Sequence, residues 1–112
     1  MDLIELENLK NYNELDLLYK IIEVAESAKK RTELVWHNNY AAGVDVRKTL
    51  QDVRLLSIIM RDQIQRRTRK GRGQDLPKES ALDKAIQTEV LRLKKEDERI
   101  EKLEEKRKKG NV

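Results

Sequence analysis

The chain has 112 residues, of which 41% are charged and 38% hydrophobic, with no Phe, one Trp and no Cys. This composition excludes an aromatic-filled core, disulfides and thiolate metal sites, and it favours an all-α chain whose long helices share a narrow apolar seam. The formal net charge is +4. No uncharged stretch approaches the roughly 18–20 residues of a membrane span, so we expect a cytoplasmic protein with no membrane partner.

The first predicted element is a helix over residues 13–36, NELDLLYKIIEVAESAKKRTELVW. Asn13, with Asp16 three residues later, resembles an N-cap followed by an acidic third position. Asp2 and Glu5 repeat this pattern and predict an earlier cap near the N-terminus. Spacings of three and four place one apolar set on a common face, which we expect to line the core: Leu15, Leu17, Leu18, Ile21, Ile22 and Ala25.

A second helix is predicted from Ala41 to about residue 68. A turn at HNNY (37–40) precedes it, because Asn tolerates left-handed backbone and competes for local hydrogen bonds. Two helices joined by a short loop form an antiparallel helical hairpin, which we place at residues 1–68. The spacing of three and four residues between apolar positions of the second helix predicts its core face. This face consists of Val46, Leu50, Val53, Leu56, Ser57, Ile59, Met60 and Ile64.

Residues 69–78 are predicted to be a basic linker, because this stretch holds two of the four Gly and the only Pro. The third segment, 79–112, is predicted to be a long amphipathic helix over about 79–109, with Ser80 and Asp83 as a capping box. Its apolar stripe is too narrow to be buried alone, so we expect a coiled-coil-like contact with a protein partner or self-association through 79–109. The stripe consists of Leu82, Ile86, Val90, Leu93, Ile100 and Leu103.

Catalytic and cofactor chemistry is not expected. His37 is the only His and lies in the predicted turn, and without Cys it has no partner for a metal site. Gly71 and Gly73 lack the third Gly and the preceding strand of a phosphate-binding loop. The carboxylates alternate with Lys along helix faces, which is typical of a solvated surface. We therefore expect a protein that is not an enzyme and that holds no cofactor and no metal.

The basic charge is concentrated in the middle of the chain. Residues 47–73 contain nine Lys and Arg against two Asp and Glu, whereas residues 1–46 contain five against nine. Arg residues recur every seven positions along the second helix, so they lie along one stripe that continues into the basic linker. Such a surface can follow a phosphate backbone, and it can equally be a solvated face that offsets the acidic first helix. The candidate nucleic-acid contacts are Arg47, Lys48, Arg54, Arg61, Arg66, Arg67, Arg69, Lys70 and Arg72.

Two aromatic residues, Trp36 and Tyr40, flank the predicted turn. One interpretation is that their rings offer faces to unpaired bases. Aromatic residues beside a turn more often pack against its end, so we expect these two to staple the loop to the hairpin.

The stretch AAGVDVRKTLQDVRLLSIIMRD (41–62) resembles the core of the bacterial linker-histone-like family, and the resemblance extends over about residues 12–66. In that family an A-A-G followed by spaced basic residues leads into a Leu-rich, Arg-containing helix. The resemblance implies a small helical DNA-binding protein that compacts DNA without strong sequence preference and is associated with the nucleoid. The matching positions are Ala41, Ala42, Gly43, Arg47, Lys48, Leu55, Leu56 and Arg61.

A second hypothesis comes from a different class of protein. The chain can be a helical structural or adaptor subunit of a large assembly such as a virion, in which the helices pack on neighbours. The basic segment would then fill an acidic protein groove or touch packaged nucleic acid. We place non-catalytic nucleic-acid binding slightly ahead of this alternative, with DNA ahead of RNA.

Overall fold

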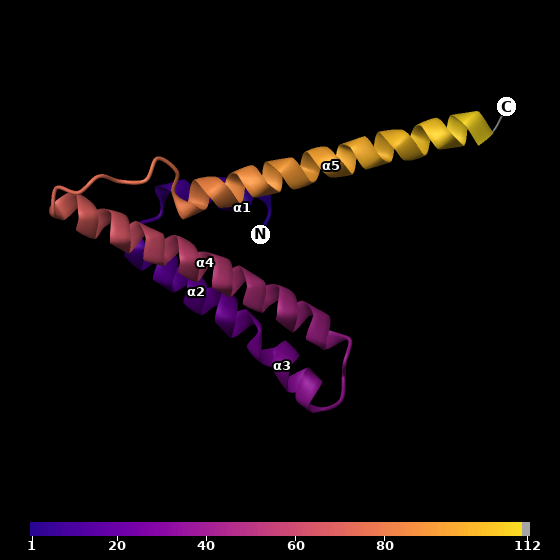
Figure 1. Ribbon diagram of the computed structural model, residues 1–112. Helices are drawn as coiled ribbons and strands as arrows, with labels where there is room; N and C mark the ends of the chain where they lie inside the picture. The colour runs from indigo at the N-terminus through magenta and orange to yellow at the C-terminus, as the bar shows by residue number, and fades with distance from the viewer. Residues whose placement is uncertain (111–112) are drawn as a thin grey trace.

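The computed structural model describes residues 1–110, and within them the chain is all-α, as predicted (Figure 1). Helices α2 and α3 run along one side of α4 and form the hairpin, while α5 extends away from it. Residues 111 and 112, at the end of the predicted third segment, lie outside the described residues. The elements are α1 (Leu3–Asn8), the 3-10 turn η1 (Leu9–Asn11), α2 (Glu14–Ser27), α3 (Lys29–Trp36), α4 (Ala42–Gly71) and α5 (Ala81–Gly110).

The predicted helix starts are confirmed by their caps. The side chain of Asn13 accepts from the backbone N–H of Asp16 at 2.8 Å, and Asp16 accepts from the N–H of Asn13 at 3.1 Å, so α2 begins with a reciprocal capping box. Asp2 accepts from the N–H of Glu5 at 2.8 Å and caps α1. These bonds are local, which explains why a short sequence window predicts them.

The predicted helix over 13–36 is interrupted at Ala28. The hydroxyl of Ser27 donates to the carbonyl of Val24 at 2.6 Å, and the N–H of Ala28 donates to Ala25 at 3.2 Å. Side-chain hydroxyls that bond back to the preceding turn compete with the regular helical pattern. The chain resumes as α3 after this shorter hydrogen bond.

The turn between α3 and α4 lies where HNNY predicts it. Asn38 has a φ of 68°, in the left-handed region that Asn tolerates. The N–H of Asn39 donates to Leu34 at 2.9 Å, and that of Asn38 donates to Val35 at 3.0 Å. Backbone hydrogen bonds alone therefore end α3 and reverse the chain.

The core joins four elements rather than two. Its fully buried members come from α1, η1, α2 and α4, and residues from the start of α5 pack against them. The N-terminal segment is held on α4 by an ion pair of 2.9 Å between the Met1 amino group and Asp52. The buried core consists of Leu6, Leu9, Leu17, Leu56 and Ile59, with Leu82, Ala85 and Ile86 among the residues packed on it.

The predicted core faces of the two hairpin helices are wrong in part. Leu17 and Leu56 are fully buried, but Leu15, Leu18, Ile22, Leu50 and Ile64 are 40–56% exposed. Ala25, also predicted to line the core, is exposed as well. Both helices carry more apolar positions than one face can hold. Because α1, η1 and the start of α5 lie on the Leu17 and Leu56 side, that side becomes the core and the other stays at the surface.

The linker lies over residues 72–80 rather than the predicted 69–78, because α4 ends later and α5 begins later than expected. Helix α4 continues to Gly71, and a Schellman-type end follows, with Gly73 at a φ of 68° and Gln74 N–H donating to Arg69 at 2.9 Å. Ser80 and Asp83 form the predicted capping box, and α5 begins at Ala81. No helix within residues 1–110 is both long enough and apolar enough to cross a membrane.

Candidate nucleic-acid interface

Three arginines form a stripe along the solvent side of α4. Arg47, Arg54 and Arg61 are exposed, and their seven-residue spacing corresponds to about 10.5 Å along a helix. At about 100° per residue, all three lie on the side of α4 opposite the buried Leu56. We call these residues the Arg stripe. Their position on the solvent side leaves them free to contact a partner.

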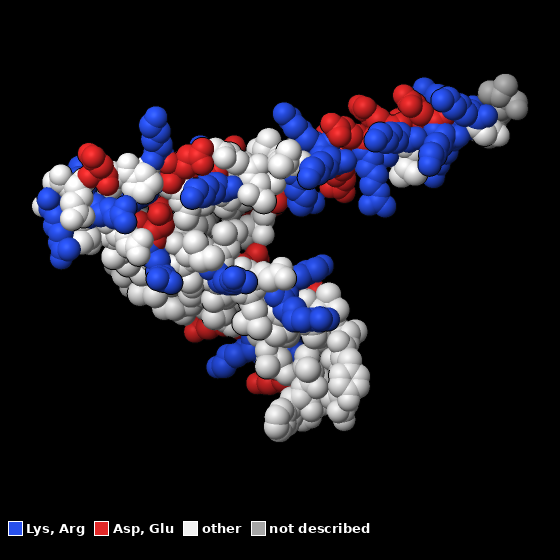
Figure 2. Space-filling view, in the orientation of Figure 1, with Lys and Arg blue, Asp and Glu red and all other residues white. Residues whose placement is uncertain are grey.

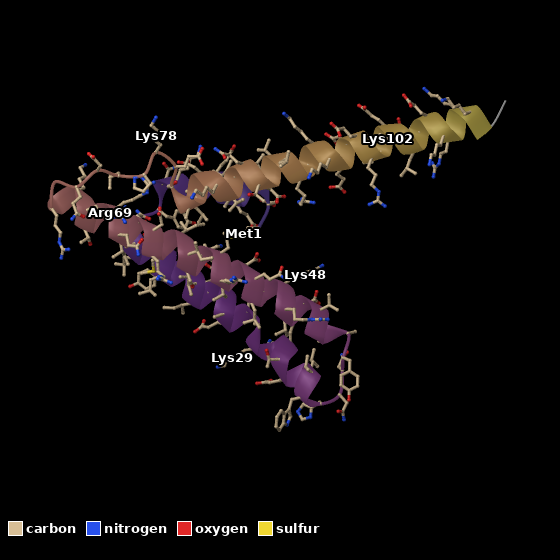
Figure 3. All side chains as sticks on the ribbon, in the orientation of Figure 1. Met1, Lys29, Lys48, Arg69, Lys78 and Lys102 are labelled. Atoms are coloured by element: carbon tan, nitrogen blue, oxygen red, sulfur yellow. The ribbon has the colours of Figure 1, made fainter. Side chains whose placement is uncertain are left out.

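Further cations stand at the two ends of the Arg stripe. Lys48 lies in the half of α4 near the hairpin tip, whereas Arg69 lies at its other end (Figure 3). Arg69 and Lys70 occupy the last turn of α4, where the helix dipole favours positive charge, and Arg72 follows. From Arg47 to Arg69 the helix extends about 33 Å, close to one turn of B-DNA.

Seven of the nine predicted contact residues make no ion pair within residues 1–110. All seven are exposed. Figure 2 shows Lys and Arg side chains projecting from the hairpin among scattered Asp and Glu, and side chains of both signs along α5. The unpaired set is Arg47, Lys48, Arg54, Arg61, Arg69, Lys70 and Arg72.

Arg66 is used inside the chain. Its Nε donates to Asp62 at 3.0 Å and its Nη2 donates to the carbonyl of Pro77 at 2.8 Å, and the side chain is 22% exposed. Asp62 also accepts from the N–H of Ala81 at 3.2 Å. Together these bonds fasten the linker and the start of α5 to α4. Asp62 stands four residues before Arg66, and this spacing is the sequence signal for the pairing.

Arg67 is also paired, but across the hairpin. Its guanidinium donates twice to Glu14, at 2.6 and 2.8 Å, and so joins the end of α4 to the start of α2. A backbone hydrogen bond and then Arg67 lower the pKa of the Glu14 carboxyl below its usual range. A planar guanidinium grips a carboxylate in this two-bond geometry. No local pattern predicts the pair, because 53 residues separate its members.

The aromatic pair at the turn does not staple the loop, so that prediction is wrong. Trp36 is 84% exposed and Tyr40 is 75% exposed. The Tyr40 hydroxyl donates to the Asn38 side chain at 3.2 Å, which leaves the ring faces open. The loop has no need of the rings, because backbone hydrogen bonds to Leu34 and Val35 already close it.

Within residues 1–110, no group of three or more His, Cys, Asp or Glu side chains converges to hold a metal ion. His37 is exposed in the hairpin turn. The site presents exposed positive charge and exposed aromatic rings.

No protein-family model matches the chain, and comparisons with curated proteins and with solved structures return no match.

Proposed function

We propose that this protein is a non-catalytic nucleic-acid-binding protein that compacts DNA with little sequence preference. The observation that carries the proposal is the set of seven exposed, unpaired cations between Arg47 and Arg72, six on α4 and one at its C-cap. Each phosphate neutralised by such a cation releases condensed counterions, and this supplies affinity that does not depend on sequence. The resemblance of residues 41–62 to the bacterial linker-histone-like family supports the same function and a place in the nucleoid.

DNA is the favoured nucleic acid because of the shape of the basic element. A single long α-helix carries the unpaired cations, and the major groove of B-DNA, about 12 Å wide, admits an α-helix. The major groove of A-form RNA is deep and narrow and excludes it. The cations from Arg47 to Arg69 also extend over about one turn of B-DNA, so one copy of the chain would contact both sides of a groove.

The dependence of duplex binding on salt tests this function. With about seven cations engaged, log K should fall against log salt with a slope on the order of −6. Changing Arg54, Arg61 and Arg69 together to Gln should flatten the slope by about three units and weaken binding equally on unrelated sequences. Helical content should be retained, because Gln is nearly as good a helix former as Arg.

A matched control removes the same charge elsewhere. Lys102, Lys106 and Lys109 lie on α5, are exposed and make no ion pair within the described part of the chain. Their triple change to Gln lowers the net charge by the same amount and should leave the slope nearly unchanged. An absence of any retarded band at low salt, or an equal loss with both triple variants, would refute binding through α4.

A second candidate function is that of a structural or adaptor subunit in a larger assembly, such as a virion. It is favoured by two exposed apolar surfaces, one on α2 at Leu15, Leu18 and Ile22 and one on α5 at Ile100 and Leu103. Apolar stripes of this kind are stabilised by contact with another chain. In this case α5 would dock on a protein or on a second copy, and the cations would meet an acidic surface.

The two functions differ in what the isolated protein does. A subunit of an assembly would show little duplex affinity at physiological salt and would change its apparent mass with concentration. A chain that ends after Val90 keeps the α5 residues that pack on the core and removes only residues 91–112. If this shortened chain has the same oligomeric state and the same partners as the full chain, the removed part of α5 makes no functional contact.

A further inference from the structure

The two most exposed large apolar side chains in the described part of the protein are Trp36, at 84%, and Tyr40, at 75%. They lie at the end of the hairpin, and we call residues 36–41 the hairpin tip. Exposed aromatic rings of this size lose favourable burial energy unless a partner covers them. The tip thus presents a surface that the fold itself leaves unused.

The tip holds the rings on an ordered backbone. Trp36 is the last residue of α3, and Tyr40 precedes α4 by two residues. The left-handed Asn38 and the hydrogen bonds that close the loop fix the chain between them. Since the backbone that carries both rings is already ordered, binding a planar ligand requires ordering of the side-chain rotamers only.

The charge around the tip favours an anionic partner. Residues 29–48, which include α3 and the start of α4, contain five Lys and Arg against two Asp and Glu. Lys29 and Lys48 lie on the two opposite arms of the hairpin in Figure 3. The Arg stripe begins at Arg47, about 7.5 Å along α4 from its first residue. A strand that follows the Arg stripe therefore arrives at the two rings.

We propose that the hairpin tip is a stacking site for unpaired nucleobases, with Trp36 and Tyr40 supplying the ring faces. This inference rests on the proposed nucleic-acid binding and specifies unpaired bases as the form of nucleic acid that the tip recognises. Base–aromatic stacking is tolerant of sequence, because every base has a π-face. Bases inside a duplex are already stacked on each other, so the rings find open faces only in single strands, gaps and splayed ends.

The preferred ligand is then a duplex with a single-stranded extension. The duplex phosphates would contact the cations of α4, and the unpaired bases would lie against the tip. Lipid is the competing partner for an exposed Trp and Tyr beside cations, because both residues are common at membrane–water interfaces. We favour nucleic acid because the cations continue along the full length of α4, far beyond the aromatic tip.

The experiment uses the fact that Trp36 is the only Trp in the chain, so its fluorescence reports on the tip alone. The full-length protein is titrated with a dT oligonucleotide of about 20 nucleotides, a duplex of the same length, and anionic phospholipid vesicles. Binding is followed in parallel by the anisotropy of a labelled nucleic acid. We expect the single strand to quench Trp36 strongly, and the duplex to bind with little quenching.

Two substitutions separate stacking from charge. Trp36→Leu keeps an apolar side chain without an aromatic face and should weaken single-strand binding on the order of 5- to 100-fold. Duplex affinity and the salt slope should stay within twofold, because no charge changes. Tyr40→Leu should weaken single-strand binding in the same direction, whereas Tyr40→Phe, which keeps the ring, should bind as the unchanged protein does.

Several outcomes overturn the stacking site. The stacking site is refuted if both Leu variants bind single strands within twofold of the unchanged protein. It is also refuted if duplex and single strand quench Trp36 equally. Neither result affects phosphate binding by α4. A blue shift of Trp36 emission on vesicles without quenching by the oligonucleotide would assign the tip to lipid. A failure to bind either nucleic acid at low salt would overturn both this site and the proposed function.

Discussion

Two leucines of α4 test which side of this helix is buried in the hairpin. Leu56 is fully buried between α1, α2 and the start of α5, whereas Leu50, in the same helix, is 56% exposed. Periodicity alone places both in the core. Each is changed to Ala, so the chemical change and the helical context are the same.

The two substitutions should lower the free energy of unfolding by amounts that differ several-fold. Leu56→Ala removes buried carbon atoms and leaves a cavity, which lowers the free energy of unfolding by about 2–5 kcal/mol. Leu50→Ala removes side-chain atoms that are more than half solvated, and Ala is the better helix former, so the loss should be below about 1 kcal/mol. For a chain of this size, a loss of about 3 kcal/mol lowers Tm by roughly 10–20 °C.

The assay is urea unfolding followed by far-ultraviolet circular dichroism, at two protein concentrations. The midpoint should fall strongly for Leu56→Ala and barely for Leu50→Ala, with similar m-values. A Leu50→Ala loss as large as that of Leu56→Ala, and independent of concentration, would mean that Leu50 faces the core. A Leu50→Ala loss that grows with concentration would instead show that a second copy covers this side.

Further predictions concern the ion pairs and α5. Asp52→Asn should lower the free energy of unfolding by about 1 kcal/mol in thermal melts, because it breaks the pair with the Met1 amino group, whereas Asp97→Asn on the exposed part of α5 should be neutral. Because the folded-state pKa of Glu14 is lowered, its contribution is present above about pH 4.3 and is lost as the pH falls through the folded value. The stability difference between the unchanged protein and Arg67→Gln should therefore narrow on acidification, and a difference that is constant from neutral to acidic pH would contradict this. In sedimentation, Ile100→Asp should abolish any self-association of the full chain, and an unchanged mass would show that α5 does not mediate it.

Sequence reasoning located the elements better than it located their contacts. The caps at Asn13 and Ser80 and the turn at Asn38 were predicted because the groups that form them lie within a few residues of one another. The exposure of Trp36 was missed, because whether a ring packs on a loop depends on how the loop closes its own hydrogen bonds. The internal use of Arg67 was missed for a similar reason, since its acceptor is distant in the chain.

Local sequence is enough to predict the all-α class, the caps at Asn13 and Ser80, and the concentration of cations in the second half of the hairpin. These follow from periodicity, capping chemistry and composition, which are local properties. Which apolar side of each hairpin helix is buried depends instead on packing between segments that are distant in the chain. Helices α2 and α4 each have two apolar sides of similar character, and the choice falls to the side that Leu6, Leu9 and Leu82 cover. The same packing decided that Arg66 and Arg67 hold the chain together while the Arg stripe faces solvent.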